Sequence, residues 1–332
     1  MALILSDADV KALNPPMRGA VEVIEQCCRI QASGDVTNHP RVHLAYPPSG
    51  VSAKRQGFGD RTLRVLPAIV PALDAVGFRT YTVGPRKSSE ASALLILFSF
   101  EDMTLKAIIN DAWLHYIRTG APAGVAAKYL ARGQIDTVGV IGSGRIARRA
   151  VEAVACVRKF TRVKVYSPNE ERRLTYAREM GGLLGVEAEP QESAQAAIQD
   201  ADILITATNA YRPVYDGRWL EPGTLVISLA PGEIDVTTLE RGKIFATWKD
   251  QALHDSPPRE PFKTLAAEGR LVEFEIKCRE LHDAVIGASP GRESDDEIIT
   301  CLVPASSIWD PAMASWAYDL AREKGIGTDV VI

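Results

Sequence analysis

One short segment in the middle of the chain limits the possible fold more than any other: residues 137–149 read TVGVIGSGRIARR. The β-branched residues before Gly142 suit a buried parallel strand. Gly142 permits a tight turn, Gly144 lets the backbone approach a pyrophosphate closely, and Ala147 allows a helix to pack closely on the strand. A helix beginning near Arg145 would present free backbone N–H groups to the phosphates. The segment therefore predicts a dinucleotide-binding turn.

The context of this turn strengthens the prediction, because a Gly-x-Gly pattern alone also occurs in turns that bind nothing. Apolar, strand-like segments follow at residues 163–166, 201–208 and 224–229, and helix-compatible stretches separate them. Alternating strands and helices are typical of a parallel, doubly wound sheet. We therefore predict an α/β fold with a Rossmann-type parallel sheet domain. The candidate cofactor-binding residues are Gly142, Ser143, Gly144, Arg145, Ile146, Ser167, Arg172, Ala207, Thr208, Ser228 and Leu229.

Bulk composition excludes several classes of protein. The 332 residues are 46% hydrophobic and 24% charged, which is enough to build the cores of two domains. A net charge of −4 argues against a general nucleic-acid binder, which needs a basic face. The first apolar stretch ends at Asp7, too early for a secretory signal or a membrane span. The five cysteines and five histidines lack metal-ligand spacing, so we expect reduced thiols, no metal and a cytoplasmic location.

A different pattern precedes the glycine turn and predicts a separate α+β domain. Residues 17–30 read as an amphipathic helix that ends before Gly34. Short strand-like segments separated by Gly, Pro, Asp or Ser then predict a largely antiparallel sheet. These segments are 41–46, 62–66, 79–83, 93–100 and 105–110.

The end of the chain is predicted to return to this first domain. An Ala-rich helix from Ile117 to Gly133 leads into the nucleotide-binding part, and the tail is helical again from Trp309 to Lys324. The last sheet signals of the nucleotide-binding part lie near residues 243–247, so we expect the tail to pack on the first domain. The predicted domains are 1–118 with 305–332, which is discontinuous, and 119–304.

Several motifs keep a specific order and spacing along nearly the whole chain. They are Pro40-Arg41, Leu66-Pro67-Ala68, Gly77-Phe78-Arg79, Ile117-Arg118-Thr119, the glycine turn, Ala207-Thr208, residues 219–224 (WLEPGT) and residues 291–298 (GRESDDEI). In these the chain resembles the ornithine cyclodeaminase/mu-crystallin family. The resemblance implies an N-terminal domain for substrate binding and dimerisation, followed by a nucleotide fold. It also implies chemistry on small amino acids with a nicotinamide cofactor, through a C=N intermediate and hydride transfer.

The resemblance also assigns roles to three arginines. Arg41 and Arg118 match arginines that hold the substrate carboxylate, a task that the planar guanidinium suits, although each could instead form a structural salt bridge. Arg79 stands where the family has a lysine. An arginine stays charged and cannot act as a general base, but it can orient a carboxylate or polarise an imine. If three arginines face one site, their charge favours a substrate that carries a second acidic group.

The loop after the strand that ends at Ser228 also departs from the family pattern, because residues 228–235 read SLAPGEID, with the acidic residue displaced. Glu233 or Asp235 could serve as proton donor, or could cap the helix that follows. We favour capping for Asp235 and leave both roles open for Glu233. Together with Arg79, this departure makes cyclodeamination of ornithine itself doubtful.

The residues after the second strand bear on the choice of cofactor. NAD-binding folds usually place an acidic residue there to bind the ribose 2′-OH. This chain has Ser167 instead, with Arg172 and Arg173 nearby, which suits the 2′-phosphate of NADP unless these arginines only form a solvated helix face. We therefore favour NADP(H) over NAD(H).

These observations predict an enzyme that reduces the C=N bond of a small α-imino acid with NAD(P)H. Arg41, Arg79 and Arg118 would bind the substrate, and Arg79 and Glu233 would act in catalysis. We expect a homodimer with no nucleic-acid or membrane partner. The alternatives are an amino-acid cyclodeaminase or dehydrogenase, and a non-catalytic NADPH-binding protein.

Overall fold

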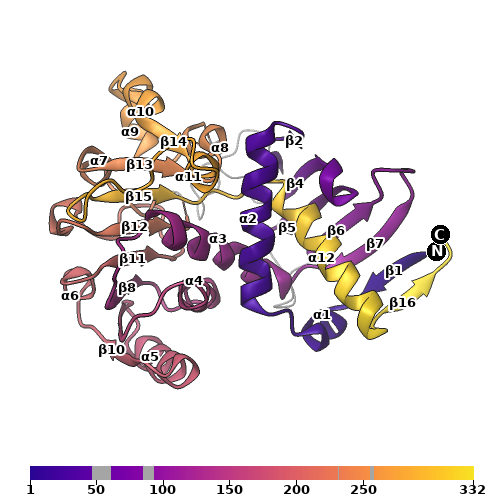
Figure 1. Cartoon of the computed structure of the whole chain (residues 1–332), viewed down its shortest axis with the longest axis horizontal. Coiled ribbons are helices and arrows are strands. Elements are labelled where there is room, and N and C mark those ends of the chain that lie inside the picture. The colour runs from indigo at the N-terminus through magenta and orange to yellow at the C-terminus, as the bar shows by residue number, and fades with distance from the viewer. Residues whose placement is uncertain (47–60, 85–92, 231, 255–257) are drawn as a thin grey trace. The chain divides into compact units, whose positions relative to one another are not determined.

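The computed structural model describes residues 1–46, 61–84, 93–230, 232–254 and 258–332, and divides them into two compact units (Figure 1). The first unit comprises Met1–Arg118 and Ser306–Ile332, so it is discontinuous in sequence. The second unit comprises Thr119–Ala305. The boundary between them falls inside helix α3 (Leu114–Leu130).

The first unit is built on a mixed sheet. Its described strands are β1 (Ala2–Leu5), β2 (Thr37–Asn38), β3 (Val42–Tyr46), β4 (Arg61–Val70), β5 (Ala75–Val83), β6 (Ala93–Phe98), β7 (Leu105–Asn110) and β16 (Thr328–Val330). Their order is β16-β1-β7-β6-β5-β4-β2, and β3 also pairs with β4. Among these, β1 and β7 run parallel and the other pairs are antiparallel. The predicted antiparallel sheet is therefore present, and the chain's first strand extends it.

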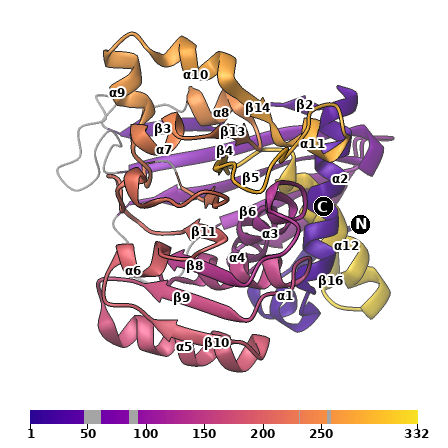
Figure 2. The same cartoon turned by 60° about the vertical axis from the view of Figure 1, so that its left-hand side comes forward.

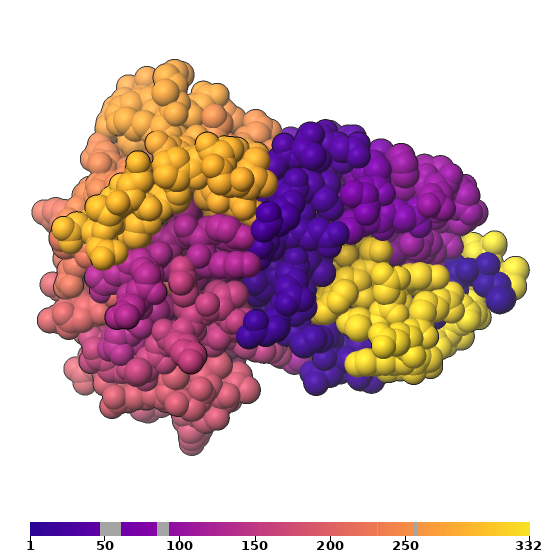
Figure 3. All heavy atoms as spheres, viewed as in Figure 1, coloured from indigo at the N-terminus to yellow at the C-terminus, as the bar shows by residue number. Residues whose placement is uncertain are grey.

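Helices pack on one face of this sheet. They are α1 (Asp7–Leu13), α2 (Met17–Ser33) and α12 (Trp309–Lys324). Helix α12 contacts strands β4 to β7 and lies beside α2, as Figure 3 shows for the yellow and indigo surfaces. Residues of α12 that face the sheet are small or apolar, such as Ala314 and Ala317, so the helix can approach closely. The tail thus packs on the first unit, as its sequence indicated.

The second unit contains a fully parallel sheet. Its strands are β8 (Thr137–Ile141), β9 (Arg162–Tyr166), β10 (Glu187–Pro190), β11 (Ile203–Thr206), β12 (Leu225–Ser228), β13 (Lys243–Ala246), β14 (Cys278–Glu280) and β15 (Ile299–Leu302). The order is β10-β9-β8-β11-β12-β15-β13-β14. Strands β8, β11 and β12 are buried throughout, as expected for a parallel sheet covered on both faces. This order confirms the predicted Rossmann-type fold.

The helices of the second unit connect these strands. They are α4 (Arg145–Ala155), α5 (Glu170–Leu184), α6 (Ala194–Ile198), α7 (Val236–Glu240), α8 (Lys249–Leu253), α9 (Phe262–Ala267), α10 (Leu271–Lys277) and α11 (Leu281–Val285). Figure 2 shows α5 running along β9 and β10. Among the described residues, every helix is too short or too polar to cross a lipid bilayer.

One sheet prediction was wrong. The last strand does not lie near residues 243–247, because β14 and β15 follow, and β15 inserts between β12 and β13. Strand β15 is only four residues long and reads Ile-Thr-Cys-Leu, which is too short to show a periodicity. Its position is fixed by burial between two neighbours, which sequence spacing does not reveal.

Candidate active site

Strand β8 lies where the strand order changes direction, since β9 and β10 continue to one side of it and β11 and β12 to the other. In open parallel sheets, ligands bind outside the carboxyl ends of the strands at this switch point. The glycine turn begins there. Gly142 has φ +119°, and a Cβ at this position would lie 2.3 Å from the carbonyl oxygen of Ala207. Only glycine fits, because both the backbone angle and the space exclude a side chain.

Gly144 has a different role in the same turn. It is the N-cap of α4 with φ −79°, and a Cβ there would meet no described atom within 4 Å. No side chain in the described part of the chain caps α4, and this helix begins directly after the open space at Gly144. An anion is favoured at such a helix end. The turn therefore fits the pyrophosphate of a nicotinamide dinucleotide.

The hydroxyl of Ser167 forms hydrogen bonds within the turn that follows β9. Its hydroxyl donates to the carbonyl oxygen of Asn169 at 3.1 Å and accepts from the hydroxyl of Ser143 at 2.9 Å. Asn169 caps α5 by accepting the N–H of Arg172 at 2.8 Å. The side chain of Arg172 is exposed and makes no ion pair with another described residue. Ser167 thus joins the two turns, and Arg172 is a cation available to a ligand.

The carboxyl ends of β11 and β12 are adjacent, because Thr206 and Ser228 are paired in register. Ala207 donates its N–H to Ile141 at 2.9 Å, and Leu229 donates to Thr206 at 3.0 Å. The structure therefore brings the predicted cofactor residues at the ends of β8, β11 and β12 together at one edge of the sheet. Pro231, in the predicted loop, lies outside the described residues.

Glu233 lies at this edge with its side chain completely buried. Its carboxylate accepts the N–H of Thr208. Burial raises the pKa of Glu233 to about 7, although hydrogen bonds from Thr208 and Thr206 oppose the shift. Near neutral pH the group can therefore hold or release a proton.

Asp235 has the capping role that we favoured. One carboxylate oxygen accepts the N–H of Thr238 at 2.8 Å at the start of α7, and the other accepts the N–H of Gly217 at 2.9 Å. Both oxygens serve backbone donors, which is the chemistry of a helix cap.

In the first unit, two predicted substrate-binding arginines form buried ion pairs. Arg79, on β5, pairs through its Nε with Asp111, the residue after β7. Arg118, on α3, pairs through its Nε with Asp310 at 3.1 Å, at the start of α12. All four residues are at most 4% exposed. We call Arg79, Asp111, Arg118 and Asp310 the buried quartet.

Arg41 belongs to the same electrostatic environment. Burial raises the pKa of Asp310 to about 6, and the charges of Arg118, Arg79 and Arg41 oppose this shift. Burial also lowers the pKa of Arg118, against the attraction of Asp310. The three arginines predicted from sequence thus lie around one buried carboxyl group.

The ion pairs with Asp111 and Asp310 alter the role that the sequence suggested for Arg79 and Arg118. The sequence prediction treated three arginines as facing a substrate, which made a second acidic group on that substrate attractive. Arg79 and Arg118 instead each have a carboxylate of the chain as partner. A second acidic group on the substrate is therefore not needed to neutralise Arg79 and Arg118.

Further charged and aromatic groups extend the quartet along the sheet. Tyr81 lies two residues beyond Arg79 on β5, opposite Arg64 of β4, which in turn lies opposite His43 of β3. The guanidinium carbon of Arg79 is 4.1 Å from the centroid of the Tyr81 ring. His115, on α3, is held neutral, because burial and then Arg79, Arg118 and Arg41 lower its pKa well below the usual value.

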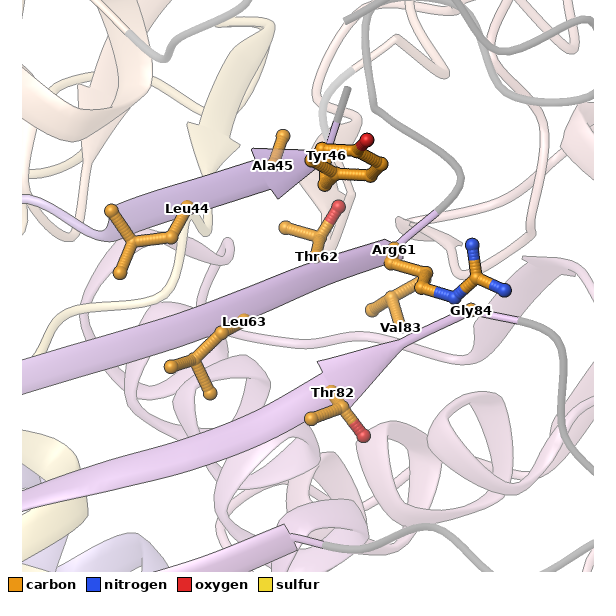
Figure 4. Close-up of a pocket in the computed structure, with 9 residues that line it drawn as sticks. All are labelled: Leu44, Ala45, Tyr46, Arg61, Thr62, Leu63, Thr82, Val83 and Gly84. Atoms are coloured by element: carbon orange, nitrogen blue, oxygen red, sulfur yellow. The ribbon is translucent and has the colours of Figure 1, made fainter. Parts of the chain in front are cut away.

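A pocket of about 480 Å³ adjoins this row at the ends of β3, β4 and β5 (Figure 4). Side chains alternate along each strand, so Ala45, Thr62 and Val83 continue the face that carries Arg64 and Tyr81. Leu44, Leu63 and Thr82 point to the opposite side in Figure 4. Arg64 and Tyr81 themselves do not line this pocket.

Sequence reasoning missed Asp111, Asp310 and Tyr81. Two of them carried a signal that could have been used, because a buried aspartate beside an apolar strand or helix requires a cation. Asp111 directly follows the apolar β7, and Asp310 lies between Trp309 and Pro311 in a helix of small residues. Tyr81 is found only from its distance to the arginines.

Comparison with known proteins identifies the family. The model of the ornithine cyclodeaminase/mu-crystallin family matches residues 2–325. The chain belongs to this family. The resemblance inferred from the sequence motifs is thereby confirmed, and so is the two-part architecture of a Rossmann-type unit with a discontinuous α+β unit.

Three members of the family illustrate the range of relatives. The Delta(1)-pyrroline-2-carboxylate reductase of Bacillus cereus is 29% identical over 276 residues, which cover 80% of this chain and 83% of that protein. The solved structure of the Thermococcus litoralis Delta(1)-pyrroline-2-carboxylate reductase, in complex with NADH and L-proline, is 27% identical with a TM-score of 0.86, covering 99% of this chain and 100% of that one. An archaeal alanine dehydrogenase dimer with bound NAD is also 27% identical with a TM-score of 0.86, covering 100% and 99%.

Proposed function

We propose that this protein reduces the C=N bond of a small α-imino acid with a reduced nicotinamide cofactor. The observation that carries the proposal is the gathering of arginines in the first unit. Arg41, Arg79 and Arg118 lie around the buried carboxyl group of Asp310, and Arg64 donates a hydrogen bond to Tyr81. Such a cluster attracts an anionic substrate such as an imino acid. The pyrroline-2-carboxylate reductases among the relatives act on a substrate of this class.

Arg79 favours reduction over the two related reactions. A cyclodeaminase or an amino-acid dehydrogenase needs a proton-exchanging group where the family has its lysine. Arg79 cannot fill that role, because Asp111 and Asp310 overcome the effect of burial and raise its pKa still further. A permanent cation can orient a carboxylate and stabilise charge at the nitrogen of an imine.

In this proposal the second unit binds the cofactor through Gly142, Gly144 and the N-terminus of α4. The bound cofactor supplies the hydride for the imine carbon. Arg41 and Arg118 bind the substrate carboxylate, and Arg79 polarises the imine. The sequence left the role of Glu233 open between proton donor and cap, and its pKa of about 7 lets it exchange a proton near neutral pH.

We further propose that the cofactor is NADP(H). Ser167 replaces the acidic residue that would bind the ribose 2′-OH, and exposed Arg172 is the third residue of α5. Arg172→Ala should weaken NADPH binding about tenfold and leave NADH binding unchanged, as measured by fluorescence titration. A wild-type protein that binds NADH more tightly than NADPH would contradict this preference.

We also propose a homodimer formed through the sheet of the first unit. The face opposite α12 carries exposed apolar side chains, with Leu44 at 59%, Tyr46 at 67%, Leu63 at 39% and Leu94 at 38% exposure. A contiguous apolar surface of this kind is typical of an interface. The related archaeal alanine dehydrogenase is a dimer.

The function is tested by following NADPH absorbance with a panel of substrates. Delta(1)-pyrroline-2-carboxylate, its six-membered homologue and mixtures of a 2-oxo acid with an amine should be reduced. Arg41→Ala should raise the KM more than it lowers kcat if Arg41 binds the carboxylate. Ammonia release from ornithine, lysine or alanine would instead favour the cyclodeaminase or dehydrogenase. Tight NADPH binding without turnover of any imine would favour a non-catalytic binding protein.

A further inference from the structure

Tyr81 occupies a position in the first unit that none of the sequence motifs singled out. It follows Arg79 by two residues on β5, so both side chains lie on the same face of the sheet. Arg64, directly opposite on β4, donates a hydrogen bond to the Tyr81 hydroxyl at 3.2 Å. The guanidinium carbons of Arg79 and Arg64 lie 4.1 and 5.6 Å from the ring centroid. The phenol is therefore held between two cations.

These cations stabilise the phenolate. Burial would raise the pKa of Tyr81, but the charges of Arg41, Arg64 and Arg79 and the hydrogen bond from Arg64 outweigh it and lower the pKa to about 8. The other titratable groups of the cluster do not reverse this effect. Asp111 and Asp310 are paired with Arg79 and Arg118, and His115 is neutral.

Tyr81 differs from the other acidic groups in its exposure to solvent. The side chains of Asp111, Asp310 and Glu233 are fully buried, whereas Tyr81 is partly exposed. The partial exposure of Tyr81 leaves its side chain accessible to a small molecule, while the buried carboxyls are out of reach without a structural change.

Given the proposed function, on which this step rests, we propose that Tyr81 is the catalytic acid that protonates the imine nitrogen. Hydride adds to the imine carbon, and the electron pair of the C=N π bond moves to nitrogen. The nitrogen takes the proton of the Tyr81 hydroxyl, which leaves a phenolate beside Arg64 and Arg79. Water then returns a proton to the phenolate. Tyr81 thus supplies the proton exchange that Arg79 cannot provide.

The test compares Tyr81→Phe with a matched control, Tyr318→Phe, at a partly exposed tyrosine of α12 that also lies beside two cations, Lys106 and Arg322. The Tyr81 variant should lose about 100-fold or more in kcat/KM for imine reduction, because general acid catalysis contributes at least that much. The Tyr318 variant should keep wild-type activity. A readout that does not depend on turnover is the near-ultraviolet absorbance of tyrosinate. The wild type should show one tyrosine that ionises near pH 8, and Tyr81→Phe should lack it.

The pH profile adds a measurement that a merely structural role would not change. Wild-type kcat/KM should fall above about pH 8, because the acid must be protonated, and this limb should disappear in Tyr81→Phe. Wild-type turnover with an unchanged rate and pH profile in Tyr81→Phe overturns this inference and leaves the proposed function standing. An alkaline limb that disappears in Glu233→Gln but not in Tyr81→Phe also overturns this inference. A wild type that reduces no imine overturns the proposed function, and with it the role of Tyr81.

Discussion

At the scale of single residues, burial and charge pairing decide what each polar group can do. Arg79 and Asp111 neutralise each other in a position with almost no access to water. Glu233 has no cationic partner among its pKa determinants, so burial acts on it almost unopposed. The first case gives a fixed cation, and the second gives a carboxyl group that titrates near neutrality.

Asp111→Asn should destabilise the protein, because it leaves the guanidinium of Arg79 buried without its counter-charge. Removing one partner of a buried ion pair typically costs about 3–5 kcal/mol of unfolding free energy. Urea unfolding would measure the loss, with Asp35→Asn at an exposed site as the control. Adding Arg79→Met should recover part of the stability. A loss no larger than that of the control would show that the pair is not coupled in solution.

Glu233→Gln should increase stability at alkaline pH. The folded-state pKa of about 7 lies above the ordinary value of 4.5, so the folded protein loses stability as the pH rises through this range. Glutamine can still accept the N–H of Thr208 but does not ionise. The variant should therefore exceed the wild type by about 2–3 kcal/mol near pH 8 and match it near pH 5. Equal unfolding free energies at both pH values would contradict the shifted pKa.

At the scale of elements, the two glycines of the turn between β8 and α4 are there for different reasons. Gly142 is needed for the fold, because its backbone angle and its distance to Ala207 exclude a side chain. The fold makes no such demand on Gly144, because a side chain there would enter only the open space at the N-terminus of α4, where we propose that the cofactor binds.

Gly142→Ala and Gly144→Ala should separate these requirements. Gly142→Ala should lower the unfolding free energy by more than about 1 kcal/mol, because alanine must adopt a positive φ and displace the Ala207 carbonyl. Gly144→Ala should leave the melting temperature unchanged and weaken NADPH binding about tenfold or more, as measured by calorimetry. Unchanged NADPH binding in Gly144→Ala would argue against a pyrophosphate at this turn.

At the scale of the whole molecule, the first unit has two unlike sheet faces. Helices α2 and α12 lie on one side of the sheet, where Leu66, Ala68 and Val70 are buried. The alternate residues of the same strand, such as Leu63 and Val65, face the other side. A second copy of this surface is complementary to it in chemistry, since both are apolar.

Light scattering should therefore give the mass of a dimer, and Leu63→Glu should convert it to a monomer. A carboxylate in the centre of an apolar interface must be desolvated without a partner. Leu174→Glu, at an exposed leucine of α5, is the matched control and should remain dimeric. A wild-type monomer would contradict the proposed assembly.

The sequence by itself determined the family, the Rossmann-type unit, the discontinuous first unit and the glycine turn after β8. β-branched strands, a Gly-x-Gly turn and helix periodicity are local signals, and the family follows from the order of motifs along the chain. The cap formed by Asp235 was predictable for the same reason. The place of β15 in the sheet was not, because four residues carry no period.

The tertiary structure decided what the arginines and acids can do. Sequence identified Arg41, Arg79 and Arg118, but their partners Asp111 and Asp310 come from strand and helix ends far away in the chain. Whether a cation faces a substrate or an aspartate depends on such long-range contacts, and so does the pKa of a buried group. Tyr81 became a candidate acid for that reason: only the folded sheet places Arg64 and Arg79 against its ring.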